Sequence, residues 1–177
     1  LIDSAYPPLA RRFLDGDTPD WRHGQMMFDL AVGGSLLATG VAILFAEPVI
    51  NAVFGSGYDR SVDIFYIHAW SCVAIAMNAA RHCWLATTSL QRFAPIVTAI
   101  GLVANVALNL VLIPSHGAVG AAIATVVSYF ATGYFASCLF PELHSIGRMQ
   151  TRALWPWKRP YLSIGTLHES YMRNSRR

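Results

Sequence analysis

Residues 105–140 read NVALNLVLIPSHGAVGAAIATVVSYFATGYFASCLF and contain no Lys, Arg, Asp or Glu. An apolar run ends at Ile113, the sequence Pro114-Ser115-His116-Gly117 is typical of a turn, and a second apolar run follows at once. The second run, from Gly117 to Phe140, is about 24 residues long. Roughly 20 apolar residues are enough for a helix to cross a bilayer. This stretch therefore predicts a membrane hairpin of two helices.

Composition supports a membrane protein. Apolar residues make up 54% of the chain and charged residues only 13%, which is about half the charged share of a soluble domain. The Lys and Arg residues gather in the two ends, so the formal net charge of +3 is a property of the flanks. A nucleic-acid-binding protein would instead carry a basic face on a folded domain, and the sequence predicts no such domain.

Four apolar segments predict an all-α integral membrane helix bundle. Prolines mark several of its boundaries: Glu47-Pro48 predicts the end of the first helix, with Val49–Phe54 as a half-turn on the outer surface, and Pro95 fits the first turn of the third. We expect helices at 26–46, 64–86, 93–113 and 117–140 within a transmembrane domain at 25–142, a cytoplasmic entry segment at 1–24 and a basic cytoplasmic tail at 143–177.

The distribution of positive charge predicts the orientation of the bundle. The two ends and the loop after residue 86 hold eleven Lys and Arg residues, or twelve with Arg81, whereas the other loops hold only Arg60. Cytoplasmic loops of membrane proteins are enriched in Lys and Arg. We therefore expect both ends of this chain on the cytoplasmic side and the turn at Ser115-His116 on the outside.

A polar patch interrupts the second predicted helix. Asn78, Arg81 and His82 are spaced i, i+3 and i+4, and therefore share one face. Two interpretations of Arg81 are open: its side chain snorkels to the cytoplasmic interface, or it faces a cavity and binds an anionic phosphate head group. Asp29, near the same side of the membrane, is a candidate ion-pair partner for Arg81.

The predicted hairpin carries a second set of polar residues and a row of small ones. Asn105 and Asn109 lie four residues apart on one face, and we interpret them as either interhelical hydrogen-bonding groups or part of a polar pathway. Small residues favour close approach of helices in lipid. The candidates for such packing are Gly117, Gly120, Ala121, Ala124 and Ser128, with the third predicted helix as the partner.

The sequence lacks the motifs of common enzymes. It has no G-x-S-x-G, H-E-x-x-H, P-loop or G-x-G-x-x-G pattern, and its carboxylates lie mainly in loops and ends. The three cysteines fall inside apolar runs without metal-ligand or disulfide spacing. We therefore predict a protein that is not an enzyme, with no metal site and no cofactor.

An ordered set of residues resembles one family of transporters. The set begins Asn105-x-x-Leu108-Asn109-Leu110-x-Leu112-Ile113-Pro114-x-x-Gly117-x-x-Gly120-Ala121-Ala122-Ile123-Ala124-Thr125 and continues with Ser128-Tyr129. It is similar to the C-terminal part of bacterial polysaccharide flippases, the oligosaccharide (O-antigen type) transporters of the multidrug/oligosaccharidyl-lipid/polysaccharide superfamily. The likeness covers roughly residues 5–150 and is strongest at 105–129.

The resemblance implies a function and a cellular location. Such proteins carry oligosaccharide on undecaprenyl pyrophosphate across the bacterial inner membrane for polysaccharide biosynthesis, using two helix bundles around a central cavity. Because they usually have twelve or more helices, we expect this chain to be a fragment that needs the missing N-terminal helices and does not transport alone. The alternatives are a structural or assembly subunit with four membrane helices, and a drug/cation antiporter of the same superfamily.

Overall fold

The computed structural model describes residues 21–55, 57–88 and 90–155, in which all regular secondary structure is helical, as the sequence predicts. The elements, in chain order, are α2 (Trp21–Phe54), α3 (Asp59–Ala69), α4 (Ser71–Thr87), α5 (Phe93–Phe130), the π-helical segment η1 (Ala131–Phe135), α6 (Ala136–Leu139), the 3₁₀ turn η2 (Pro141–Leu143) and α7 (His144–Leu154).

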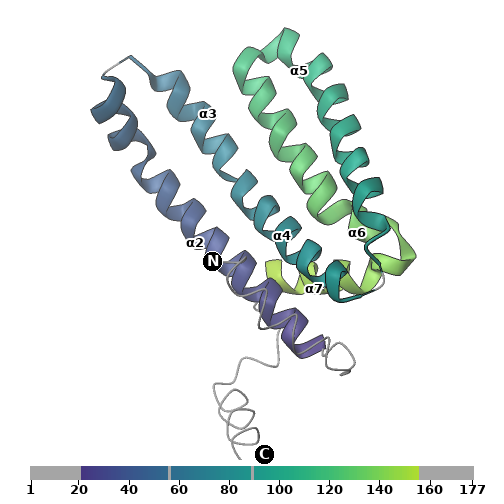
Figure 1. Cartoon of the computed structure of the whole chain (residues 1–177). Helices are drawn as coiled ribbons and strands as arrows, with labels where there is room; N and C mark the ends of the chain where they lie inside the picture. The colour runs from purple at the N-terminus through teal and green to yellow at the C-terminus, as the bar shows by residue number, and fades with distance from the viewer. Residues whose placement is uncertain (1–20, 56, 89, 156–177) are drawn as a thin grey trace, which may run out of the picture.

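The long helices lie side by side, and one short helix crosses their end (Figure 1). α3 and α4 follow one another past Trp70, and this pair lies between α2 and α5. α7 lies across the lower end of the bundle in Figure 1, where it contacts α2 and α6. The last described helix therefore packs against the first.

α2 is longer than the sequence predicts. It continues through Pro48 to Phe54, so the predicted end at that proline, and the surface half-turn at 49–54, are wrong. A proline inside a helix removes one backbone hydrogen bond, but the remaining backbone groups in an apolar setting are best satisfied by continuing the helix. The helix ends instead before Gly55, whose φ of 84° is readily adopted only by glycine.

Gly117 reverses the direction of α5. Its φ of 57° and ψ of −132° are not helical, whereas the residues on both sides of it are. α5 therefore has two antiparallel parts, which Figure 1 shows side by side. We call residues 93–116 the first arm and residues 118–139, which include η1 and α6, the second arm. The predicted hairpin is present, with a first helix that extends to His116.

The buried core lies at the α7 end of the bundle. Its large members include Phe28 on α2, Met77 and Trp84 on α4, and Ile146 and Met149 on α7. Because α7 supplies the inner face of this core, it is an integral part of the packed structure and not a free extension of α6.

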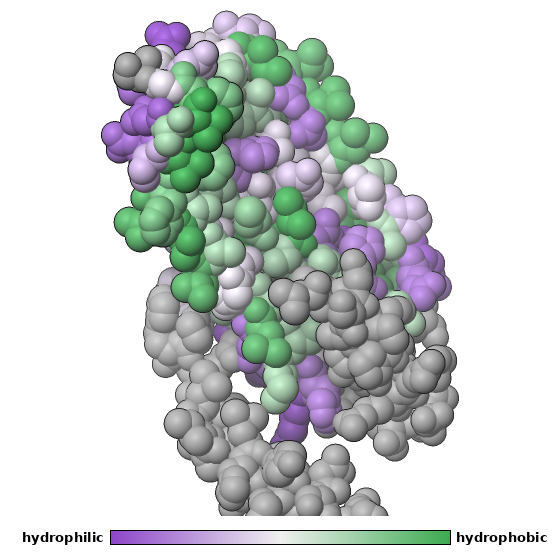
Figure 2. Space-filling view, turned by 60° about the vertical axis from the view of Figure 1, so that its left-hand side comes forward, coloured by the Kyte–Doolittle hydropathy of each residue, from purple (hydrophilic) through white to green (hydrophobic). Residues whose placement is uncertain are grey.

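Three described helical stretches are long and apolar enough to cross a membrane: Trp21–Phe54, Asp59–Thr87 and Phe93–Leu139, the last of which is folded in two at Gly117. Much of their apolar surface is exposed. Leu30, Leu37 and Leu44 recur every seven residues along α2 and are 71%, 71% and 72% exposed. Figure 2 shows green apolar side chains over much of the face that it brings forward. These features indicate a membrane-embedded protein, and the number of four crossings stays a prediction.

The predicted entry segment and tail are described only in part. Residues 21–24 belong to the first turns of α2, and residues 144–154 form α7, so the predicted tail begins with a packed helix. Residues 1–20 and 156–177 lie outside the described residues. These two ranges hold most of the basic residues on which the predicted orientation depends.

Candidate functional site

Arg81 is fully buried inside the bundle, which is the most unusual feature of the structure. Its guanidinium donates hydrogen bonds from Nη1 to the backbone carbonyl of Thr132 and from Nη2 to Oδ1 of Asn78. Neither partner is a carboxylate. The side chain is enclosed by protein and binds the second arm instead of extending to the bundle surface, so the predicted snorkelling is wrong.

The carbonyl that Arg81 contacts belongs to an irregular part of the second arm. Residues Ala131–Phe135 form a π-helical turn, in which Ala136 N–H donates to Ala131 O, five residues earlier. Two sequence features favour a wide turn at this place. Thr132 Oγ1 donates to Ser128 O (2.9 Å) and thereby competes with the backbone ladder. Gly133 allows close contact with α4. Such π-turns are rare and are frequent at functional sites.

A second buried side chain binds the next carbonyl of the same turn. Gln150 on α7 is fully buried, and its Nε2 donates to Gly133 O at 2.6 Å. Tyr134 and Thr151 add a hydroxyl–hydroxyl hydrogen bond of 2.9 Å between η1 and α7. The π-turn is therefore held from two sides, by Arg81 from α4 and by Gln150 from α7.

Three polar atoms around this turn are buried without a hydrogen-bond partner in the described part of the chain: Arg81 Nε, Ser137 Oγ and Gln150 Oε1. Buried polar groups in native proteins are usually hydrogen-bonded, and leaving one unsatisfied costs about 1–3 kcal/mol. The cluster of Arg81, Asn78, Gln150, Ser137 and the π-turn is therefore the candidate functional site.

The other members of the predicted polar patch are placed differently. His82 is exposed and makes no hydrogen bond to Arg81 or Asn78. Asp29 does not form an ion pair with Arg81, and the prediction of that pair is wrong. Its Oδ1 instead accepts a hydrogen bond from Gln25 Nε2 (2.7 Å), one turn earlier on α2. Helical spacing correctly predicts that Asn78 and Arg81 share one face of the helix. It does not predict which residues of other helices pack against that face.

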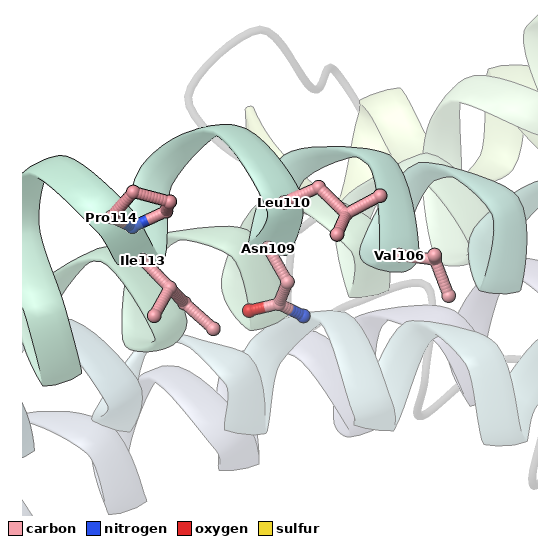
Figure 3. A pocket seen from close by; sticks show the side chains of 5 residues that line it. All are labelled: Val106, Asn109, Leu110, Ile113 and Pro114. Atoms are coloured by element: carbon pink, nitrogen blue, oxygen red, sulfur yellow. The ribbon is translucent and has the colours of Figure 1, made fainter.

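The two asparagines of the hairpin bond to each other. Asn109 Nδ2 donates to Asn105 Oδ1 at 3.0 Å, and both side chains are half-buried. Asn109 also lines a shallow, mainly apolar hollow of about 350 Å³ together with Val106, Leu110, Ile113 and Pro114 (Figure 3). In Figure 3 the Asn109 side chain points from α5 toward the neighbouring helices. The hollow is separate from the Arg81 cluster and offers a single polar side chain.

The predicted row of small residues lies mostly in the packed face of the second arm. Gly120, Ala124 and Ser128 are buried, Ala121 is half-buried, and Gly117 is exposed at the reversal. The first arm approaches this row through Gly101, where a Cβ atom would overlap Thr132 Oγ1 and lie 3.4 Å from Ser128 O. The two arms therefore pack closely at Gly101, directly beside the π-turn.

Sequence reasoning missed Gln150 and the π-turn. Ile146, Met149 and Ala153 form an apolar set at helical spacing, and this amphipathic pattern is the signal that α7 packs on the bundle. Gln150 directly follows Met149 and is buried with this set. Thr132 and Gly133 favour the π-turn, but they do not identify it in the sequence, because Thr and Gly are also common in regular membrane helices. Among the described residues, no group of three or more His, Cys, Asp or Glu side chains is placed to hold a metal ion.

Comparisons with known proteins returned no match among family models, curated proteins or solved structures.

Proposed function

We propose that this chain is part of a flippase that moves lipid-linked oligosaccharide, carried on undecaprenyl pyrophosphate, across the bacterial inner membrane for polysaccharide biosynthesis. The observation that carries the proposal is the buried Arg81, six residues before the end of α4 at Thr87 and thus about 9 Å from it at 1.5 Å per residue. A cation inside a membrane helix costs about 2.5–3.5 kcal/mol and typically marks a transport pathway or a charge pair.

The surroundings of Arg81 favour an anionic substrate over a structural charge pair. Within the described residues its hydrogen-bond acceptors are an amide and a backbone carbonyl, so its positive charge is not neutralised by a neighbouring carboxylate. A guanidinium is well suited to bind phosphate oxygens in a bidentate manner. The ordered residue set at 105–129 supports the same class of transporter, because it resembles the family that carries a pyrophosphate-linked sugar.

The extensive apolar surface supports a larger bundle around this chain. Gly33, Gly34 and Gly40 on α2 have nothing within 4 Å of where a Cβ would lie, so the described helices do not require glycine there. Further helices of the same protein would pack against this surface, with their backbones close to α2. In this proposal both ends of the chain are cytoplasmic.

A complementation assay tests the proposal. The complete open reading frame that contains this chain is expressed in a strain that lacks its polysaccharide flippase, and surface polysaccharide and lipid-linked oligosaccharide are measured. We expect export to be restored by the parent protein, reduced at least about tenfold by Arg81→Ala, and partly retained by Arg81→Lys, which keeps the charge. Arg60→Ala, which removes an exposed arginine from the other end of the bundle, is the control.

Protein level and size-exclusion profile are measured for each variant, because Arg81 also contributes to packing. Normal export by Arg81→Ala at normal protein level would remove Arg81 from the pathway. A parent protein that is present at normal level but restores no export would contradict the flippase assignment.

One observation favours a second candidate, a structural or assembly subunit of a membrane complex. Arg81 and Gln150 both bind backbone carbonyls, which is a use that needs no substrate. The two candidates differ in a measurable way. Loss of a flippase leaves lipid-linked oligosaccharide in the inner leaflet, whereas loss of an assembly subunit lowers the amount of its partner enzyme and hence of the lipid-linked product.

A further inference from the structure

The π-turn at Ala131–Phe135 is the place where four helical elements of the described chain meet. Gly101 of the first arm lies against Thr132, and a Cβ at Gly133 would lie 2.9 Å from Ala74 O on α4. α7 reaches the same turn through Gln150 and Thr151. A change in the shape of this turn therefore moves groups on α4, on both arms and on α7.

The two carbonyls of the turn are satisfied by side chains that belong to different helices. Arg81 binds Thr132 O and Gln150 binds Gly133 O. In a regular α-helix Thr132 O would instead accept from the N–H of Ala136, four residues later. That N–H is now bonded to Ala131 O. The two side chains thus occupy acceptors that the backbone itself would use after conversion to an α-helix.

The same turn holds polar groups that its present geometry does not satisfy. Ser137 Oγ and Gln150 Oε1, next to the turn, and Arg81 Nε are buried without a hydrogen-bond partner in the described residues. Such groups cost free energy. The open π-turn therefore carries a free-energy cost, and such a cost narrows the gap to an alternative conformation, as a two-state element requires.

We propose that residues Ala131–Phe135 form a two-state hinge, in which α7 holds the π-turn open through Gln150 and thereby keeps Arg81 bound to Thr132. When Gln150 leaves Gly133 O, the segment closes into a regular α-helix and Thr132 O is taken by the backbone. The π-turn contains one residue more than a regular helical turn, and each residue of an α-helix turns the chain by about 100°. Closure therefore rotates α6 by about this angle about the helix axis, relative to the rest of the second arm. Arg81 then loses one of its two acceptors, Thr132 O, while it keeps Asn78 Oδ1, and the freed guanidinium N–H becomes available to an anion.

α7 is suited to control this hinge because its two faces have different partners. Its inner face is buried and carries Gln150, while Arg148 on its outer face is exposed at the end of the bundle. Gln25 on α2 also holds α7, by donating from Nε2 to Met149 O at 3.0 Å. A movement of α7 on the bundle is thereby transmitted to the π-turn. The last step, binding of an anion by Arg81, rests on the proposed function; the hinge itself does not.

A double-mutant cycle tests whether Arg81 and Gln150 hold one two-state turn. The Tm of the purified full-length protein in detergent is measured for Arg81→Met, Gln150→Ala and the double variant. If both side chains hold the same turn, removal of either one closes it, and the double variant loses little more Tm than the larger single loss. A double loss equal to the sum of the single losses contradicts the hinge.

Met149→Ala is the matched control on α7. It truncates a buried core side chain and leaves in place both carbonyl contacts and the Tyr134–Thr151 hydrogen bond. Its loss of Tm should therefore add to that of Arg81→Met. If it is as non-additive as Gln150→Ala, the coupling reflects general packing of α7, and the hinge is contradicted.

A deletion gives an independent measurement if Arg81→Met does not yield folded protein. Deletion of Ala131 removes the extra residue of the π-turn, so the segment becomes α-helical and α6 and α7 keep their register. Gln150→Ala should then lower Tm by less than about a third of its effect in the parent chain, because Gly133 O no longer needs a side-chain donor. The proposal is overturned if Gln150→Ala lowers Tm equally in both chains. It is also overturned if deletion of Ala131 reduces the amount of folded protein as much as deletion of Val127, which lies in the regular helix. These measurements involve no transport, so a failed hinge and a failed flippase assignment are distinguished.

Discussion

Single residues in this bundle differ mainly in what lies next to them, and two glycines illustrate this. Gly101 and Gly40 both lie inside apolar helices. A Cβ at Gly101 would overlap Thr132 on the second arm, whereas a Cβ at Gly40 would meet nothing within 4 Å. The first glycine is required by close packing of the two arms, and the second is not required by any described neighbour.

We expect Gly101→Ala to lower the free energy of unfolding by about 1–3 kcal/mol, the usual cost of overpacking. Gly40→Ala is the control and should be neutral or raise it by up to about 1 kcal/mol, because alanine favours the helix over glycine. Thermal or denaturant unfolding of the purified full-length protein measures both. A Gly101→Ala variant as stable as the parent would show that the arms do not approach as closely as described.

Arg81 shows where prediction from sequence stops at this scale. Its depth in the helix follows from its distance to the end of the apolar run, and its shared face with Asn78 follows from helical spacing. The direction of its side chain does not, because it depends on the π-turn, which is 51 residues away in the sequence. Because segments distant in the sequence bury Arg81, its side chain binds a carbonyl inside the protein and does not snorkel as predicted.

At the scale of elements, apolar length predicts the helices, and proline predicts a helix start at Pro95 but not the helix ends at Pro48 and Pro114. The apolar segments predicted four helical regions that correspond to α2, to α3 with α4, and to the two arms of α5. Pro48 lies inside α2 and Pro114 inside the first arm, and the chain turns instead at Gly55 and Gly117, where φ is positive. The sequence predicts residues 144–154 as part of a tail, because the apolar face of α7 spans only about three turns.

We expect Gly117→Ala to destabilise the hairpin by about 1–3 kcal/mol, because a side chain at this φ and ψ is strained. Hydrogen exchange of the peptides on both sides of the turn, around residues 110–124, should become faster. Gly34→Ala, at a helical glycine with nothing within 4 Å, is the matched control and should leave that exchange unchanged. Unchanged exchange in Gly117→Ala would mean that the turn tolerates another conformation.

At the scale of the whole molecule, the described bundle is thinly packed away from α7. Beyond Val32, α2 buries only Thr39 and Ala46 among its described residues. The described basic side chains are also unevenly placed. Arg22, Arg92, Arg148 and Arg152 belong to segments at the α7 end, and Arg60 belongs to a segment at the other end. The orientation of the bundle stays a prediction from the whole sequence.

Cysteine labelling in whole cells tests that orientation. In a full-length protein from which Cys72, Cys83 and Cys138 have been removed, Ser115→Cys is compared with Arg148→Cys. A membrane-impermeant maleimide should label Ser115→Cys in intact cells and Arg148→Cys only after the membrane is made permeable, because cytoplasmic segments carry the excess of positive charge. The opposite pattern would invert the orientation of the bundle.

The contact between α2 and α7 also has a consequence during synthesis. Gln25 and Met149, which share a hydrogen bond, are separated by 124 residues. At about 5–20 residues per second, the ribosome needs about 6–25 s to make that length of chain. For this interval α2 is already in the membrane while the helix that completes its inner face does not yet exist. The bundle can close only after α7 has been made, so truncation before α7 should leave a chain that membrane quality-control proteases recognise as unfinished.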